Sequence, residues 1–100
     1  MLRVADEVDP AHPALAGHFP GNPVVPGALL LARVVRAVAA AFGSPVGAVR
    51  GAKFHAPLRP GERFEVEFER DAAGAVKFRV LRGATLIAAG DLSLNAAPNA

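Results

Sequence analysis

The sequence predicts an α+β protein in which a curved antiparallel sheet wraps around one helix. Two observations predict this class. Residues 28–42 contain neither Gly nor Pro and are rich in Ala and Leu, which favours a single long helix. The C-terminal half instead alternates apolar and polar residues between turn signals, which is typical of strands with one buried and one solvated face. One strand before the helix and about four after it give the expected order.

The first half of the chain should hold a short strand and then the helix. Residues 2–8 favour the strand, and the Asp9-Pro10 step begins an irregular segment. The helix over 28–42 is expected to end at Gly43, because glycine readily adopts the left-handed conformation that terminates helices. On a helical wheel the larger apolar side chains gather on one broad face. They are Leu30, Leu31, Val34, Val35, Val38 and Phe42.

The second half is expected to form the remaining strands. A strand at 48–56 precedes a turn at 57–61, and a final strand follows from Thr85 to Leu94. Between them, the alternating segments 64–69 and 76–80 predict a hairpin. Its loop would be residues 72–74, with Gly74 in the left-handed conformation.

The expected register of this hairpin places Glu69 opposite Lys77 and Glu67 opposite Arg79, so opposite charges face each other. Arg82-Gly83 would form the next tight turn. The glutamates of this region are assigned to the solvated side of a strand. They are Glu62, Glu65, Glu67 and Glu69.

Length and composition narrow the class further. A chain of 100 residues has room for one domain, expected to span residues 1–100, and its 52% hydrophobic content favours self-association. The net charge of +2 comes from interspersed basic and acidic residues, which argues against a nucleic-acid partner. Cysteine is absent, which excludes disulfides and thiolate nucleophiles.

The sequence also predicts a cytoplasmic protein without a membrane span. The longest apolar run, 28–41, is interrupted by Arg33 and Arg36 and is too short to cross a bilayer. The N-terminus lacks the basic start and apolar core of a targeting peptide. Both arginines are expected on a solvated helix face.

The most informative stretch is the eleven-residue run from Gly17 to Gly27, GHFPGNPVVPG, directly before the helix. Its three prolines fix φ, and its glycines permit close backbone approach, so the run should form a rigid loop. His18 would then have a defined position beside a helix N-terminus. Since histidine titrates near neutral pH, a histidine fixed in this way is a candidate acid–base catalyst. Alternatively, it could only hold the loop.

The run resembles the histidine loop of the β-hydroxyacyl-acyl carrier protein dehydratases, which are hotdog-fold enzymes. Residues 49–62, VRGAKFHAPLRPGE, are similar to the family's strand and Pro-Gly turn, and residues 76–94 resemble its last hairpin. The chain looks most like the short dehydratase-like members. The resemblance implies a hotdog domain that acts on a 3-hydroxyacyl thioester carried on acyl carrier protein or coenzyme A.

The resemblance also implies roles for residues of the loop and helix. His18 would remove the proton next to the thioester carbonyl, and the carbonyl of Val24 would hold the other ring nitrogen of His18. The backbone N–H groups of Gly27 and Ala28 would bind the thioester oxygen, in keeping with the positive end of a helix dipole. Phe19 would form a wall beside the acyl chain.

One catalytic group of the family is absent. The family's helix carboxylate, contributed by the partner subunit, corresponds to Ala32, and residues 10–61 contain neither Asp nor Glu. Arg36, one turn further along, could reach the space that the carboxylate would fill. Three interpretations stay open. His18 acts as base and then acid, with water or His55 assisting; another subunit supplies the carboxylate; or the chain binds acyl thioesters without dehydrating them.

The predicted function is therefore dehydration of a 3-hydroxyacyl thioester to the 2-enoyl thioester, with His18 as the base. The alternatives are a non-catalytic thioester-binding or partner subunit and an acyl thioesterase. No cofactor is implied, and three scattered histidines give no metal-ligand spacing. His12 is expected in solvent, and His55 is expected to be a packed or surface residue. The partner would be a second copy or another hotdog subunit, because the active sites of the family lie between subunits.

Overall fold

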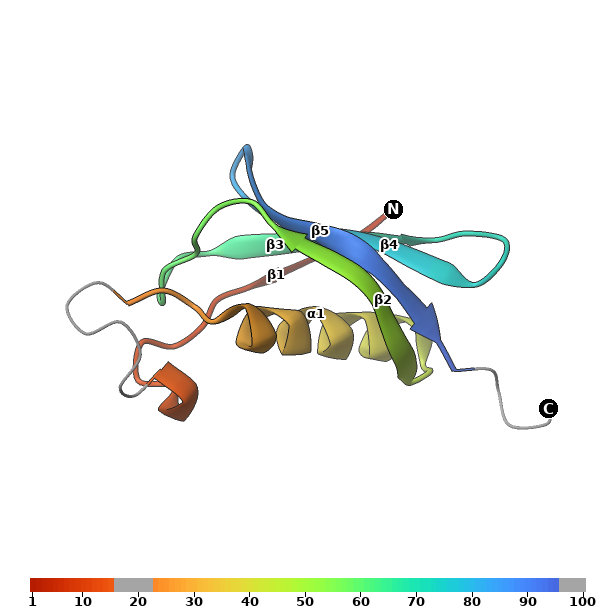
Figure 1. Ribbon diagram of the computed structural model, residues 1–100, viewed down its shortest axis with the longest axis horizontal. Helices are drawn as coiled ribbons and strands as arrows, with labels where there is room; N and C mark the ends of the chain where they lie inside the picture. Colours follow the sequence, from red (N-terminus) through yellow and green to blue (C-terminus); the bar gives the residue numbers. More distant parts are fainter. Residues whose placement is uncertain (16–22, 96–100) are drawn as a thin grey trace.

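The computed structural model describes residues 1–15 and 23–95, which form one helix packed on one face of a five-stranded sheet (Figure 1). The strands lie in the order β1-β3-β4-β5-β2, and every neighbouring pair is antiparallel. The elements are β1 (Leu2–Asp6), the short 3-10 helix η1 (Pro13–Leu15), α1 (Gly27–Phe42), β2 (Val46–Phe54), β3 (Phe64–Arg70), β4 (Ala75–Arg82) and β5 (Thr85–Leu94). This arrangement confirms the predicted class.

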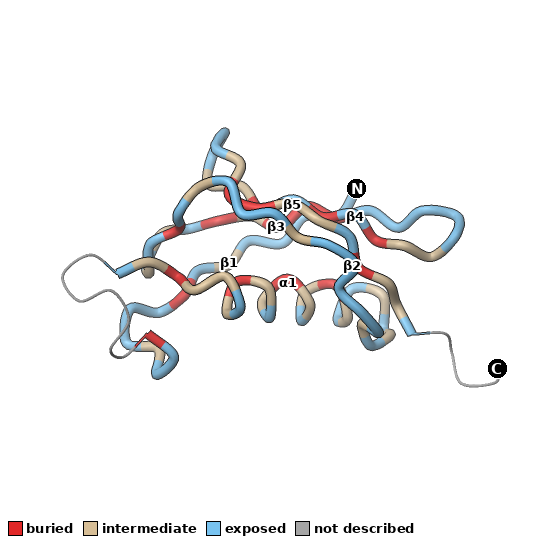
Figure 2. Tube along the Cα trace, viewed as in Figure 1, coloured by how far each residue is buried: buried red, intermediate tan, exposed pale blue. Residues whose placement is uncertain are grey.

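Helix α1 begins one residue earlier than expected and ends as predicted. Gly43 adopts φ 62° and ψ 29°, and its N–H donates to the carbonyl of Ala39, which closes the last turn. Leu30, Val34 and Val38 are buried at spacings of four residues, so they form one stripe against the sheet. Figure 2 shows that the buried positions of α1 lie on the side that faces the strands.

The hairpin of β3 and β4 has the register expected from charge pairing. Glu69 lies opposite Lys77, and Glu67 lies opposite Arg79. Gly74 has φ 89° in the connecting turn. The alternation also places the apolar residues of both strands in the core. They are Phe64, Val66, Phe68, Val76, Phe78 and Val80.

The sequence misplaced the bounds of the first two strands. β1 ends at Asp6 rather than Val8, because Asp6 pairs with Phe64, the first residue of β3, and no partner strand continues beyond it. β2 spans 46–54 rather than 48–56. Its ladder begins with Val46 opposite Leu94, and two irregularities follow along β2, one before Ala48 and one before Gly51.

Glu67 was wrongly assigned to a solvated face, because it is only 5% exposed. Its carboxylate accepts a hydrogen bond of 2.6 Å from Arg79 and another from Arg3 on β1. These two guanidinium groups, that of Arg79 foremost, hold the pKa of Glu67 below its usual value. The cluster ties three neighbouring strands together on the face away from α1.

Candidate active site

Three separate segments meet at the end of the molecule where α1 begins. The N–H of Val25 donates to the carbonyl of Leu58 at 2.7 Å, and the N–H of Gly61 donates to the carbonyl of Val8 at 2.8 Å. Gly61 has φ 84°, a conformation that favours glycine in this turn. The segment before the helix and the turn at 57–62 are therefore held against each other, beside β1.

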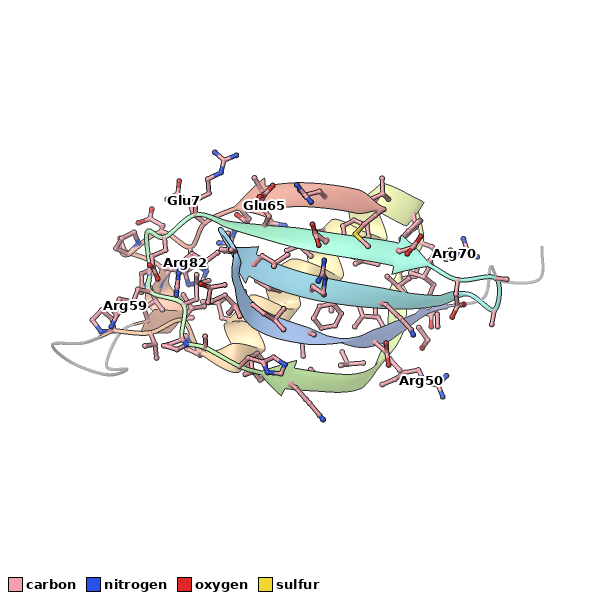
Figure 3. The ribbon with its side chains drawn as sticks, turned by 90° about the horizontal axis from the view of Figure 1, so that it is seen from above. Glu7, Arg50, Arg59, Glu65, Arg70 and Arg82 are labelled. Carbon is pink, nitrogen blue, oxygen red and sulfur yellow. The ribbon has the colours of Figure 1, made fainter. Side chains whose placement is uncertain are left out.

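Arg82 at the end of β4 holds the same turn from the other side. Its Nη1 donates to the carbonyl of Pro57 at 2.7 Å and lies 3.3 Å from Oε1 of Glu62. The same Oε1 accepts the N–H of Arg59 at 2.7 Å. Figure 3 shows Arg59 and Arg82 together at this end of the sheet. The sequence placed Arg82 only in a tight turn, and no motif marks its contacts with the turn at 57–62.

A mainly apolar cleft of about 420 Å³ lies between these segments and the first turn of α1. Its lining combines residues from before the helix, from α1, from the end of β2 and from the turn that follows it. They are Val24, Val25, Gly27, Leu30, Phe54, His55, Ala56, Pro57, Leu58 and Ile87. Among the described residues His55 is the one titratable side chain of this lining, and no carboxylate belongs to it.

The cleft reaches backbone donors at the start of α1. The first intrahelical bond joins the N–H of Leu30 to the carbonyl of Pro26 at 3.0 Å, so the N–H groups of Gly27 and Ala28 precede it. Pro26, the residue before the helix, has no polar side-chain atom that could accept a hydrogen bond from these N–H groups. Among the described residues, no side chain caps this end of α1. Two N–H groups at a positive helix end can stabilise negative charge on a carbonyl oxygen.

Gly27 is packed against the phenyl ring of Phe54, which is 52% exposed. A Cβ atom on Gly27 would lie 2.9 Å from Cζ of that ring, closer than a normal contact. Glycine at this position therefore lets the Phe54 ring pack closely against the first residue of the helix.

The structure places the sequence-predicted residues in two groups. Val24 and Gly27 line the cleft, and Ala28 is exposed in the first helical turn beside it. Ala32 and Arg36 are exposed further along α1 and do not line this cleft. His18 and Phe19 lie outside the described residues.

Two expectations for other side chains are decided by contacts. Arg33 is not in free solvent, because both oxygens of Asp6 accept its Nη1 at 3.1 Å and join α1 to β1. His55 is exposed, which agrees with the expectation of a packed or surface residue. Its backbone N–H donates to the carbonyl of Ile87 at 2.7 Å. Within residues 1–15 and 23–95, no three potential metal ligands come together.

A larger hollow of about 670 Å³ lies on the opposite face of the sheet. Its lining includes Glu67, Arg79 and Lys77, and the first two are already paired with each other. This larger hollow is not lined by the N-terminus of α1 or by the segment that precedes it. The smaller apolar cleft is therefore the better candidate for thioester chemistry.

One helix wrapped by an antiparallel sheet, with a cleft at the start of that helix, is the hotdog fold. Residues 2–91 match the ApeI-like family, described as ApeI dehydratase, and the chain belongs to this family.

Individual relatives agree with this assignment. The 3-hydroxyacyl-[acyl-carrier-protein] dehydratase FabZ of Proteus mirabilis is 33% identical over 92 residues, which cover 79% of this chain and 61% of FabZ. The chain thus spans less than two thirds of the length of this curated relative.

Two solved structures share the fold. The dehydratase heterocomplex ApeI:P from Xenorhabdus doucetiae matches with a TM-score of 0.80 and 24% identity, over 94% of this chain and 86% of the other. A variant of the fluoroacetyl-CoA-specific thioesterase FlK matches with a TM-score of 0.67 and 18% identity, over 95% of this chain and 89% of the other. Both likenesses concern the fold alone.

Proposed function

We propose that this chain dehydrates a 3-hydroxyacyl thioester, carried on acyl carrier protein or coenzyme A, to the 2-enoyl thioester. The observation that carries the proposal is the apolar cleft that Val24 and Gly27 line at the start of α1, beside Ala28 and directly after the segment that contains His18. Membership of the ApeI-like family and similarity to FabZ support the same reaction.

In the proposed reaction, the thioester oxygen accepts hydrogen bonds from Gly27 and Ala28. These bonds lower the energy of the enolate-like state that forms when a base removes the proton from the carbon next to the carbonyl. His18 is that base, and the carbonyl of Val24 orients its ring. The electron pair then forms the carbon–carbon double bond, the bond to the 3-hydroxyl breaks, and the hydroxyl leaves as water after it accepts a proton.

The proton for the leaving hydroxyl is the open step, because no carboxylate lines the cleft among the described residues and Ala32 stands where the family has its acid. We infer that a second hotdog subunit supplies the carboxylate. The Xenorhabdus structure that shares the fold is a dehydratase heterocomplex, which is consistent with a second subunit. Return of the proton by His18 itself, with water or His55 assisting, is the other catalytic route.

Pairing between subunits fits the exposed surface of the chain. β2 is a terminal strand of the sheet, and Val49 on it is 41% exposed. The adjacent helix presents Ala28, Ala32 and Arg36 to solvent. A dimer that covers β2 and this stripe of α1 would place a partner beside Ala32.

Within the described residues, no helix is both long and apolar enough to cross a membrane.

The second candidate is an acyl-thioester-binding subunit that performs no chemistry. The lack of any carboxylate from residue 10 to residue 61 specifically favours it. A thioesterase is the third possibility, and FlK supports only the shared fold.

Mass spectrometry of a 3-hydroxyacyl carrier protein incubated with the protein distinguishes these functions. Loss of one water indicates dehydration and a free carrier thiol indicates hydrolysis, whereas an unchanged thioester that co-elutes with the protein indicates that this chain by itself only binds the thioester.

A further inference from the structure

We propose that Arg82, at the end of β4, is a positioning residue for the candidate active site. Its guanidinium group fixes the turn at 57–62, and this turn fixes the segment that leads into α1. The inference rests on the proposed function and deepens it, because it adds a residue that acts on the reaction without touching the substrate. Arg82 itself does not line the apolar cleft.

The guanidinium group of Arg82 joins the two ends of the turn (Figure 3). Its Nη1 donates a hydrogen bond of 2.7 Å to the carbonyl of Pro57, where the turn begins, and lies 3.3 Å from Oε1 of Glu62, where the turn ends. The same Oε1 accepts the backbone N–H of Arg59 at 2.7 Å. The side chains of Arg82 and Glu62 are 30% and 32% exposed, so solvent and salt screen their attraction only in part.

Arg82 acts from a fixed support. Its backbone is paired with Thr85 in the ladder of β4 and β5, whereas the turn at 57–62 belongs to no strand. A guanidinium group is planar and carries several donors, so it can bind a carbonyl and a carboxylate at the same time. The side chain therefore transmits the position of the sheet to a turn that the sheet does not hold directly.

The turn in turn holds the segment before the helix. The carbonyl of Leu58 accepts the N–H of Val25 at 2.7 Å. Residues 23–26 begin and end with proline, which has no N–H, so only Val24 and Val25 can donate from this segment. Leu58 is 2% exposed and Val25 is 7% exposed, so breaking this hydrogen bond would leave buried polar groups without a partner.

A displaced turn would move two walls of the cleft at once. Pro57 and Leu58 line it from the turn, and Val24 and Gly27 line it from the segment and the helix start. A misplacement of about 1 Å can cost about 100-fold in rate. The apolar lining itself would stay in place, so loss of Arg82 should impair the chemical step more than binding of the acyl group.

The test compares Arg82→Gln and Arg82→Lys with the wild type and with two matched controls. Arg79→Gln removes an ion pair to Glu67 from the same strand, on the face away from α1, and so controls for lost stability. Arg59→Gln removes an equal charge from the turn but keeps the backbone N–H that donates to Glu62. For each protein we would measure the melting temperature, kcat and KM for dehydration, and hydrogen exchange of the Val25 amide by NMR.

Arg82→Gln should lower kcat by about 10–100-fold and change KM by less than about threefold. The Val25 amide should exchange about tenfold faster in Arg82→Gln than in Arg79→Gln, because the hydrogen bond to Leu58 opens more often. Arg82→Lys keeps a positively charged donor and should recover part of kcat. Both controls should keep kcat within about twofold of the wild type. If Arg82→Gln does not fold, Glu62→Ala removes the other half of the ion pair and should show the same loss of kcat and the same faster exchange.

Wild-type kcat in Arg82→Gln would overturn the inference. An equal loss of kcat in Arg59→Gln would also overturn it, since the effect would then come from charge, and an equal loss in Arg79→Gln would assign the effect to stability. If the wild type itself does not dehydrate the thioester, the proposed function fails. Exchange of the Val25 amide then decides by itself whether Arg82 fixes the wall of the cleft.

Discussion

Replacing Gly27 by Ala should reduce the proposed activity while leaving the fold stable. The added methyl group would lie 2.9 Å from Cζ and 3.2 Å from Cε1 of the Phe54 ring. Since Phe54 is 52% exposed and its ring is the far end of a rotatable side chain, the ring can move aside. The displaced ring and the new methyl group would then both crowd the approach to the first N–H groups of α1.

The opposing effects on stability are similar in size. Ala is favoured over Gly within a helix by about 1 kcal/mol, and less at the first position. Moving a side chain from its preferred rotamer costs about 0.5–1.5 kcal/mol. The net change should therefore stay within about 1 kcal/mol, which corresponds to ~4–8 °C in Tm for a domain of this size. Removal of one oxyanion donor costs about 10²–10³ in rate, so partial obstruction of both donors should cost about 10–100-fold in kcat/KM.

Thermal unfolding and dehydration kinetics of Gly27→Ala would be compared with those of Gly51→Ala. The control glycine lies on β2 with nothing within 4 Å of an added Cβ. In a double-mutant cycle, adding Phe54→Ala to Gly27→Ala should recover part of the lost activity, because Phe54→Ala removes the ring that the new methyl group displaces. Unchanged kcat/KM in Gly27→Ala would refute the assignment of these N–H groups to the thioester oxygen.

The remaining predictions address the base, the missing acid and the buried carboxylate. His18→Ala should abolish dehydration and the reverse hydration and leave the circular dichroism spectrum unchanged, because the neighbouring prolines stiffen the loop without the imidazole; undiminished turnover contradicts this role. Ala32→Glu should raise the rate of dehydration by up to ~10²–10⁴-fold. The gain should be clearer when Arg36→Ala also removes a cation that would lower the pKa of the new acid. If both variants fold and bind the carrier without any gain in rate, the missing carboxylate does not limit the site. Glu67→Gln should lower the free energy of unfolding at neutral pH. The difference from wild type should shrink as the pH falls through the lowered pKa of Glu67, because a carboxylate with a depressed pKa stabilises the fold only while it is ionised. A difference in urea unfolding that is constant with pH would contradict the role of the Arg79 and Arg3 hydrogen bonds.

Local chemistry made much of the fold predictable from the sequence. Alternation along 64–69 and 76–80 located the central hairpin, and its register followed from opposite charges, since Glu69 does face Lys77. Gly43 and Gly74 were recognised because turns with positive φ favour glycine. These signals lie within a few residues of the structure that they determine.

The misplaced features depend on residues distant in the sequence. Burial of Glu67 requires Arg3, which is 64 positions away and reaches β3 only because β1 pairs beside it. Likewise, the end of β1 depends on where its partner strand begins, at Phe64. Periodicity assigns a side chain to one face of a strand, but it does not reveal which long side chains will cover that face.

The candidate site was partly predictable for the same reason. The family resemblance pointed to Gly27 and Ala28, whose role stays a prediction, whereas the wall made by Leu58 and Ile87 and the support from Arg82 required the three-dimensional structure. Those residues carry no local signature, because they act through contacts made across the sheet.

The central claim is tested most directly by the mass of the acyl group on a 3-hydroxyacyl carrier protein after incubation with the wild type and, separately, with Ala32→Glu. The account predicts a species lighter by one water, formed in at least one of the two samples, and conversion of the enoyl thioester back to the hydroxyacyl form in the reverse direction. An acyl group that keeps its mass with both proteins, or a free carrier thiol, would contradict it.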